Sequence, residues 1–220
     1  MPHHVLALFA KWPRVGEAKT RLGAKGAEIA RAFLLDSVER YSRIDVRRVL
    51  AFAPADAQEQ FADLVQDKFN LVAQLQGDLG QRLSGFLEQQ LRAGADSVVF
   101  LGTDSPTLPL EYVAEAFTSL ETADVVLGPA TDGGYYLLGC ARRVPPIFHG
   151  ISWSTNRVLR ETVAALSDPQ WRVALLPPWN DVDTLADWQM LCGHVAALRR
   201  CGIDPHLLHT EALMARCLNS

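Results

Sequence analysis

Short apolar runs alternate with longer amphipathic stretches along this chain, and this alternation limits the fold more than any other sequence feature. The short runs are continuous and apolar, as expected for strands that are covered on both faces. In the longer stretches apolar residues recur with a period near 3.6, as in helices. The pattern predicts an α/β fold with a mostly parallel sheet between two helical layers. The expected strands are Val5–Ala10, Arg48–Ala53, Leu71–Leu75, Ser97–Leu101, Asp124–Leu127, Tyr135–Gly139 and Val173–Leu176, and the expected helices are Ala27–Tyr41, Leu79–Ala93, Leu110–Leu120, Thr155–Leu166, Leu185–Leu198 and Glu211–Leu218.

One strand is expected to break the parallel pattern. Only the residues Gly128 to Gly134 separate the fifth predicted strand from the sixth. A crossover between neighbouring parallel strands needs a dozen residues or more. The strand Tyr135–Gly139 is therefore expected to run antiparallel or to belong to another part of the sheet.

Size and charge narrow the class of protein. A chain of 220 residues suits a single domain, 1–220, and its net charge of −4 without a basic stripe argues against a nucleic-acid partner. No apolar run is long enough for a membrane span. The four cysteines form no C-x-x-C pair, so reduced thiols and a cytoplasmic location are expected. The last two helices could pack inside the chain or form a homodimer, and the sequence does not decide between them.

Polar segments follow the predicted strands where their carboxyl ends should meet. Ligands of open parallel sheets bind at that edge, so the coincidence predicts a ligand site. The segments are residues 11–21, 102–106, 131–134 and 180–184.

The first of these segments has the composition of a phosphate site. It contains cations, a glycine and a threonine and leads into a helix, whose N-terminal N–H groups favour anions. It is not a Walker A loop, because the glycines do not have the required spacing. The alternative is a solvated basic turn. The predicted nucleotide-binding residues here are Lys11, Arg14, Gly16, Lys19, Thr20 and Arg21.

Three aspartates are candidate ligands of Mg²⁺ or Mn²⁺. Asp104 follows a buried strand, and Mg²⁺ takes one or two protein carboxylates together with water and phosphate. Asp181 and Asp183 stand at i and i+2 of an extended segment, so both could reach one ion. Alternatively, Asp104 is a turn residue, and Asp183 or Thr184 caps the next helix. Asp187 stands at a capping-box-like offset from Thr184. If Asp183 is the cap, Asp181 is the better ligand candidate, and the sequence does not separate the two aspartates.

Further candidates stand in other loops. Asp132-Gly133-Gly134 would let the backbone approach a ligand, although Asp-Gly is also a common hairpin turn. Trp153 could line an acceptor pocket or belong to the core, and Ser154 or Thr155 is expected to cap the following helix. Asp78 and its neighbours could contact a base or ribose.

Five motifs, in order over nearly the whole chain, resemble the bacterial DUF2064 family, whose members are usually labelled glycosyltransferase A or nucleotide-diphospho-sugar transferase-like proteins. They are Lys-x-Pro-x-x-Gly-x-x-Lys-Thr-Arg-Leu from Lys11, Gly-Thr-Asp-Ser-Pro from Gly102, Gly-Pro-Ala-x-Asp-Gly-Gly-Tyr from Gly128, Trp-Ser-Thr from Trp153 and Asp-Val-Asp-Thr from Asp181. A more distant similarity is to phospholactate, phosphoenolpyruvate and molybdenum cofactor guanylyltransferases.

The resemblance implies a GT-A fold, a Rossmann-like three-layer structure with a nucleotide half and an acceptor half. Carried over by position, it implies that Lys11, Lys19 and Arg21 hold phosphates, and that the metal is held by Asp104, Asp181 and Asp183. GT-A glycosyltransferases usually carry a D-x-D in mid-chain, whereas this chain has a single aspartate there and its D-x-D late.

That arrangement favours a nucleotidyltransferase. An acceptor phosphate or carboxylate would attack the α-phosphorus of a nucleoside triphosphate, and lysines such as Lys19 would stabilise the pyrophosphate leaving group. One alternative is a glycosyltransferase that uses a nucleotide-sugar, with Asp132 as the base. Another is a nucleotide-binding protein without turnover. Fold analogy does not decide between these reactions.

Overall fold

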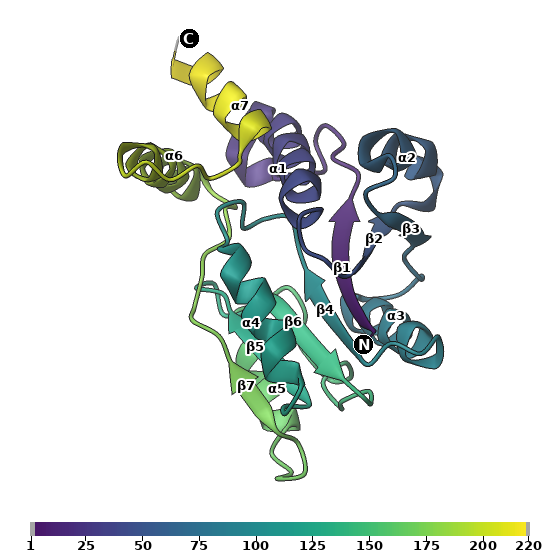
Figure 1. Ribbon diagram of the computed structural model, residues 1–220. Helices are drawn as coiled ribbons and strands as arrows, with labels where there is room; N and C mark the ends of the chain where they lie inside the picture. Colours follow the sequence, from purple (N-terminus) through teal and green to yellow (C-terminus); the bar gives the residue numbers. More distant parts are fainter. Residues whose placement is uncertain (1–2, 219–220) are drawn as a thin grey trace.

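The computed structural model describes residues 3–218, with the backbone alone for 217 and 218. It contains a seven-stranded mixed sheet with the strand order β3-β2-β1-β4-β6-β5-β7 (Figure 1). Each strand is a short run of mostly apolar residues, as the sequence predicts. Their bounds are β1 His4–Lys11, β2 Arg47–Ala53, β3 Asn70–Ala73, β4 Ser97–Leu101, β5 Val125–Pro129, β6 Tyr135–Ala141 and β7 Val173–Leu175.

The helices cover both faces of the sheet, so the predicted three-layer α/β fold is confirmed. Side chains of α1, α2 and α4 form the hydrophobic core on one face, and those of α3 and α5 pack against the other. The helices are α1 Gly26–Tyr41, α2 Gln58–Val65, α3 Leu79–Arg92, α4 Leu110–Leu120, α5 Val158–Ala165, α6 Leu185–Arg200 and α7 Leu208–Leu218, with short 3₁₀ helices η1 Thr20–Lys25 and η2 Ala55–Ala57.

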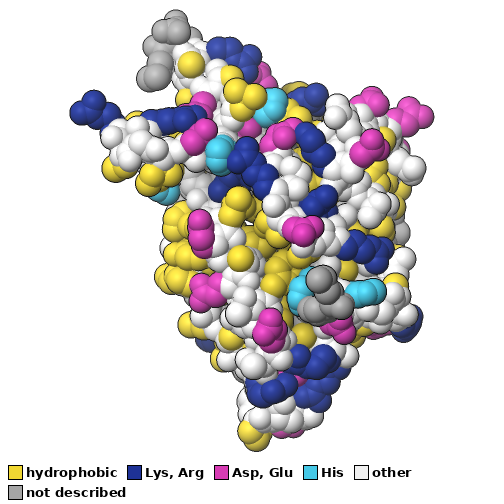
Figure 2. Space-filling view, in the orientation of Figure 1, with side chains coloured by type: hydrophobic (Ala, Val, Ile, Leu, Met, Phe, Trp, Pro, Cys, Tyr) yellow, Lys and Arg dark blue, Asp and Glu magenta, His cyan; other side chains and the backbone are white. Residues whose placement is uncertain are grey.

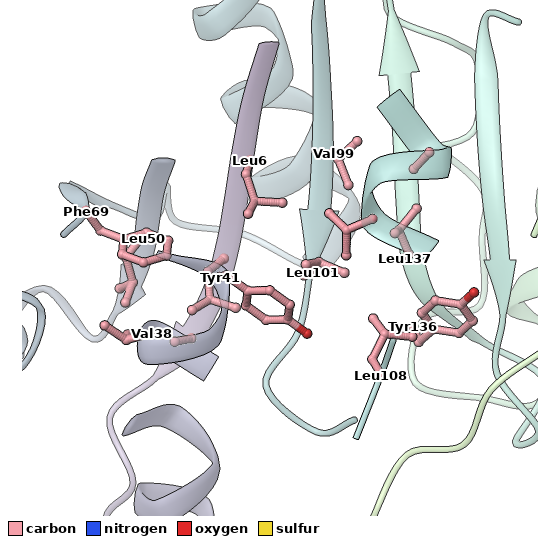
Figure 3. Packing of buried hydrophobic residues seen from close by; sticks show 14 of the residues in the cluster. Leu6, Val38, Tyr41, Leu50, Phe69, Val99, Leu101, Leu108, Tyr136 and Leu137 are labelled. Atoms are coloured by element: carbon pink, nitrogen blue, oxygen red, sulfur yellow. The ribbon is translucent and has the colours of Figure 1, made fainter. Parts of the chain in front are cut away.

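Alternation along the strands divides the core between the two faces. On β1, Leu6, Leu8 and Ala10 face α1 and α4, whereas Val5 and Ala7 face α3. Figure 3 shows Leu6 beside equivalent side chains of the neighbouring strands, and Tyr41 of α1 reaching toward them. Period-two alternation of this kind fixes strand register, because a one-residue slip would exchange the two faces.

The reversed strand is where the sequence suggested it. β6 lies between β4 and β5 and runs antiparallel to both, while the other neighbouring strands pair in parallel. The amino end of β6 therefore lies at the same edge as the carboxyl ends of the parallel strands. As a result, the short β5–β6 connection stays at that edge and never crosses the sheet.

The last two helices form a third cluster on the outer side of α1. Phe33 of α1 packs against Trp188, Leu191 and Val195 of α6 and against Leu213 of α7. Asp36 accepts hydrogen bonds from the backbone N–H groups of His209 (2.9 Å) and Thr210 (2.8 Å) at the start of α7. The apolar faces of these helices are thus used within the chain, and a homodimer stays a prediction.

Two local predictions are wrong. Helix α2 was not expected, because only Phe61 and Val65 mark its buried side. Helix α5 begins at Val158, and neither Ser154 nor Thr155 caps it; its first turn follows a turn in which Ser154 has a φ of 62°. A helix start predicted from Ser or Thr alone fails here because the hydroxyl of Thr155 bonds to the backbone oxygen of Ser152 (2.7 Å).

No described helix has the length and apolar character that crossing a membrane requires. On the face in Figure 2, lysine and arginine side chains are interspersed with aspartate and glutamate. That distribution agrees with the absence of a basic stripe in the sequence.

Candidate functional site

The polar segments of the sequence converge at the carboxyl edge of the sheet. Three adjoining pockets open there, and residues after β1, β4, β5 and β7 line them. The phosphate pocket has a volume of about 360 Å³, and its lining includes Lys11, Lys19, Thr20, Arg21, Asp104 and Asp183. The acidic pocket has a volume of about 540 Å³, and its lining includes Asp104, Asp132, Gly134, Trp153, Asp181 and Asp183. The outer pocket has a volume of about 260 Å³, and its lining includes Lys11, Trp12, Arg14, Gln74 and Arg82.

Lys19 lies at the centre of this site. Its side chain is only 6% exposed, and its Nζ lies 2.6 Å from Asp104 Oδ1 and 3.2 Å from Asp183 Oδ1. The ammonium also donates to the carbonyl of Val182 at 2.6 Å. Lys19 has a left-handed backbone with a φ of 46°, which aims its side chain away from η1 toward the two acids. One cation thus joins the first loop to the two acidic loops.

The two acidic loops are also tied to each other. The backbone N–H of Val182 donates to the carbonyl of Asp104 at 2.8 Å. The hydroxyl of Ser105 donates to Oδ1 of Asp181. These contacts hold Asp104, Asp181 and Asp183 around one space, although Asp104 lies far from the other two along the chain.

The buried side of the loop after β4 is fixed by Arg40 of α1. This arginine is 6% exposed, and its guanidinium donates to the carbonyls of Pro106 and Leu108, the latter at 2.6 Å. Sequence reasoning missed both Arg40 and Ser105. Ser105 stands in the Gly-Thr-Asp-Ser-Pro motif and could have been noticed, whereas Arg40 looks like any basic residue of a last helical turn.

Ionisation of the Asp181 side chain is unfavourable in the folded protein. Burial raises its pKa to about 6, and the nearby carboxylates of Asp104, Asp132 and Asp183 act in the same direction, while the Ser105 hydrogen bond opposes them. A positive charge beyond Lys19 would relieve this repulsion. The acidic pocket is therefore matched to a cationic ligand or to an anion that arrives with one.

The structure decides between the two possible caps of α6, and the outcome favours the site. Thr184, not Asp183, caps α6, in a capping box with Asp187. Asp183 is free to face the pockets, where Oδ2 also lies 3.3 Å from Arg21. Both carboxylates of the D-x-D segment thus line the acidic pocket.

Asp104, Asp181 and Asp183 are the residues that could hold a divalent cation, and the ammonium of Lys19 now occupies the space between two of them. The ammonium of Lys19 already sits between two carboxylates, as a cation shared by Asp104 and Asp183 would. Within residues 3–218, no three His, Cys, Asp or Glu side chains are grouped closely enough to form a metal site by themselves. Mg²⁺ needs only one or two protein carboxylates when phosphates supply the other oxygens.

The structure separates the remaining candidates into two groups. Lys11, Thr20 and Arg21 line the phosphate pocket, and Asp132 and Gly134 line the acidic pocket. Gly133 has a φ of 93°, and a Cβ there would lie 2.4 Å from the carbonyl oxygen of Asn156, so this glycine serves a tight backbone contact.

Besides Gly133, three predicted residues lie apart from the phosphate and acidic pockets. Arg14 lines the outer pocket, and its Nη2 lies 2.9 Å from both carboxylate oxygens of Asp56. Gly16 provides a turn with a φ of 80°. Asp78 caps α3 in a capping box with Gln81. Trp153, by contrast, lines the acidic pocket, with its ring edge-to-face with Tyr135 at 6.3 Å.

The chain is similar to several solved structures over nearly its whole length. The chain is 32% identical to a "putative nucleotide-diphospho-sugar transferase" from Desulfovibrio desulfuricans G20, with 98% of each chain covered and a TM-score of 0.86. No curated protein sequence matches it.

Two more distant structures share the fold. One is CMP:2-keto-3-deoxy-manno-octonic acid synthetase complexed with CTP, at 13% identity, with 89% of this chain and 99% of that chain covered and a TM-score of 0.56. The other is Rv0371c of Mycobacterium tuberculosis H37Rv in complex with manganese, at 17% identity, with 87% and 98% covered and a TM-score of 0.51.

The fold is therefore that of the nucleotide-diphospho-sugar transferases and related synthetases, as the sequence motifs implied. A family model described as "Uncharacterized protein conserved in bacteria (DUF2064)" matches residues 35–155, which is more than half of the chain. The motifs outside that range, at Lys11–Leu22 and Asp181–Thr184, lie at the same site as those within it. The chain belongs to the DUF2064 family.

Proposed function

We propose that this protein is a metal-dependent nucleotidyltransferase, which transfers a nucleotidyl group from a nucleoside triphosphate to a small phosphorylated or carboxylate acceptor and releases pyrophosphate. The observation that carries the proposal is the position of Lys19, whose ammonium is held by Asp104 and Asp183 where a cationic loop meets an acidic one. Phosphates and a divalent cation are the ligands that satisfy both loops at once.

The residues divide the work as follows. Lys11, Lys19 and Arg21 bind the β- and γ-phosphates from the phosphate pocket. Asp104, Asp181 and Asp183 hold Mg²⁺ or Mn²⁺, which, when bound, offsets the negative charge of the phosphates. Trp12, Gln74 and Arg82 surround the nucleoside in the outer pocket. Structural neighbours that contain CTP or manganese support this assignment.

In the reaction, an oxygen of the acceptor attacks the α-phosphorus in line with the bridging oxygen to the β-phosphorus. A P–O bond to the acceptor forms, the P–O bond to pyrophosphate breaks, and the leaving group departs with the electron pair. Lys19 and Arg21 stabilise its added charge by hydrogen bonds. An acceptor that is already ionised has no proton to lose, so no general base is needed.

Glycosyl transfer from a nucleotide-sugar is the second candidate. It is favoured by the name given to the Desulfovibrio desulfuricans protein, which is 32% identical to this chain. Asp132 would then act as the base that deprotonates an acceptor hydroxyl. It lines the acidic pocket, and its Oδ1 accepts a hydrogen bond from the backbone N–H of Gly134 at 2.8 Å, which fixes its orientation.

Ligand-dependent thermal unfolding tests the proposal. Nucleoside triphosphates and nucleotide-sugars are titrated with and without Mn²⁺ into the wild type, Asp104→Ala and a control, Asp63→Ala on the exposed side of α2. At a hundred times Kd, a ligand should stabilise the fold by about 2.7 kcal/mol, or about 5–10 °C. A triphosphate should give this shift only with metal, in the wild type and the control but not in Asp104→Ala.

The outcomes separate the candidate functions. A larger shift with a nucleotide-sugar than with a triphosphate would indicate that the protein is a glycosyltransferase and not a nucleotidyltransferase. A triphosphate shift without pyrophosphate release on any acceptor would support a nucleotide-binding protein without turnover. If no nucleotide shifts the transition at millimolar concentration, the proposed function is wrong.

A further inference from the structure

A fourth pocket adjoins the acidic pocket, and its lining is of a different character. We call it the apolar recess. It has a volume of about 270 Å³ and lies between the sheet and the first turns of α3. Its apolar wall consists of Phe9 of β1, Phe100 of β4, Leu138 of β6 and Leu79 and Leu83 of α3, together with Tyr135.

The walls of the recess are firmly packed. Phe100 and Leu83 are 4% and 5% exposed, and Leu138 is 1% exposed. The rings of Phe9 and Phe100 meet edge-to-face with centroids 5.5 Å apart. Well-packed walls keep their shape, so the cavity is a property of the fold and does not depend on the rotamer of a single side chain. Leu79, at the mouth, is 41% exposed.

The recess continues the acidic pocket and not the outer pocket. Leu79, Asp104 and Tyr135 line both the recess and the acidic pocket. No residue lines both the recess and the outer pocket. Phe9, Gly102 and Asp104 also line the phosphate pocket, so the recess adjoins the phosphate and acidic pockets and is set apart from the outer pocket, where the nucleoside is proposed to bind. We therefore assign the recess to the acceptor.

Charge excludes the phosphates of the donor as occupants. Asp104 is the only charged residue that lines the recess, and it is an acid. A phosphate there would meet a like charge and no cation, which is costly in an apolar surrounding. An apolar group, by contrast, gains by leaving water for this space.

From this juxtaposition we infer that the acceptor is amphipathic, with an anionic group in the acidic pocket, where Lys19 and the proposed metal ion offset the charge of Asp104, and an aromatic ring in the apolar recess. The inference rests on the proposed transferase function, but not on which group is transferred. Phe9, Phe100 and Tyr135 offer ring edges and faces to such a group. The size also agrees, since an apolar protein cavity of about 150 Å³ holds a benzene molecule.

Binding of two simple phosphates tests the inference. Phenyl phosphate and methyl phosphate carry similar anionic groups, but only the first can fill the recess. Their affinities are measured by isothermal titration calorimetry on the full chain with Mn²⁺ and a nucleoside triphosphate whose α,β-bridging oxygen is replaced by methylene. Because each buried CH₂ contributes roughly fourfold in affinity, phenyl phosphate should bind at least tenfold more tightly.

A blocking variant identifies the place. Leu79→Trp puts a larger ring at the partly exposed mouth and should reduce the preference for phenyl phosphate to less than threefold. The matched control is Leu208→Trp, at a leucine of α7 that is 74% exposed and lies outside all four pockets. It should keep the wild-type preference. Thermal unfolding of both variants establishes that each is folded.

Two results would overturn the inference. One is equal affinity for the two phosphates, or binding by neither of them. The other is a phenyl preference that persists in folded Leu79→Trp, which would mean that the ring binds elsewhere. Titration of the nucleotide alone reports separately on the proposed function, because the phosphate and outer pockets do not include Leu79.

Discussion

At the scale of one residue, the unfavourable ionisation of the buried Asp181 side chain marks the candidate site. Its pKa of about 6 in the folded protein exceeds the ordinary 3.8, because the side chain is buried among other carboxylates. The folded state thus binds the proton more tightly than the unfolded state. The free energy of unfolding should therefore fall as the pH rises from about 4 to about 6, and should stay lower above that.

Replacing this charge should stabilise the protein and harm the site. At pH 7 we expect Asp181→Asn to raise the free energy of unfolding without metal by about 1–2 kcal/mol, because the amide removes the buried charge and can keep the Ser105 contact. Denaturant unfolding at pH 4.5 and pH 7 measures the gain, most of which should be lost at the lower pH.

The same variant should bind Mn²⁺ at least tenfold more weakly at pH 7, as followed by titration calorimetry. Asp63→Asn, at an exposed position of α2, serves as the control and should change neither quantity. A destabilised Asp181→Asn would show that the charge of Asp181 is already compensated by contacts within the fold.

At the scale of elements, the site depends on how α3 and the edge strands are anchored. The first turn of α3 lies against the segment that carries Trp153: a Cβ at Gly80 would lie 2.2 Å from the carbonyl oxygen of Phe148 and 2.5 Å from Nε1 of Trp153. At the far end of the sheet, Asp124 joins Arg142 and Arg172, which flank β6 and β7. Each anchor yields a separate prediction.

Two glycines of α3 should respond oppositely to the same substitution. Gly80→Ala should lower the free energy of unfolding by about 1–3 kcal/mol, because a carbonyl and an indole must move. At Gly85 the Cβ would meet only Cδ1 of Leu75, a side chain that is 56% exposed and can turn away. Gly85→Ala should therefore be neutral or stabilising by up to about 1 kcal/mol through helix propensity. Equal effects in denaturant unfolding would argue against the close packing at Gly80.

Acid should loosen the edge of the sheet through Asp124. Burial alone would raise its pKa, but hydrogen bonds from Arg172 and Arg142 outweigh burial and lower the pKa to about 2. The resulting stability, roughly 2 kcal/mol, is present above about pH 4 and is lost as the pH falls toward 2. Asp124→Asn should remove most of it at pH 7 and flatten that part of the pH profile in thermal unfolding. A variant with an unchanged acid limb would contradict this role of Asp124.

The sequence predicts most of the elements but few of their contacts. Continuous apolar runs and the seven residues between β5 and β6 were enough for the mixed sheet, because burial on both faces and crossover length are local properties. The cap of α6 stayed open between Asp183 and Thr184, since both fit the pattern and only backbone geometry decides. Arg40 and the apolar recess could not be found, because they depend on residues from distant elements that meet only in the folded chain.

At the scale of the whole molecule, α6 and α7 connect the site to the outer side of α1. Helix α6 begins at Leu185, two residues after Asp183, and Trp188 on its buried side stacks with Phe33 of α1. Lys19, which leads into η1 and then α1, contacts the segment that leads into α6. The geometry of the pockets thus depends on contacts between the first and last thirds of the chain.

A pair of leucines in α6 tests this dependence. Leu191 is fully buried, and Leu185 is 59% exposed. Leu191→Ala should lower the free energy of unfolding by about 2–5 kcal/mol, because it leaves a cavity between α6 and α1. Leu185→Ala should change it by less than about 0.5 kcal/mol. A small effect of Leu191→Ala in denaturant unfolding would indicate that α6 can separate from α1 without affecting the rest of the protein.

Lys19 also affects the charge balance of the protein before any ligand binds. Small zinc domains stay unfolded until their metal arrives, because nothing else neutralises their ligands. Here the chain brings its own counter-ion to the acidic loops, since the ammonium of Lys19 lies between Asp104 and Asp183. The charges of the acidic loops are therefore partly balanced within the fold, and under the proposed function a metal ion would take over this role from Lys19, whose ammonium would turn to the phosphates.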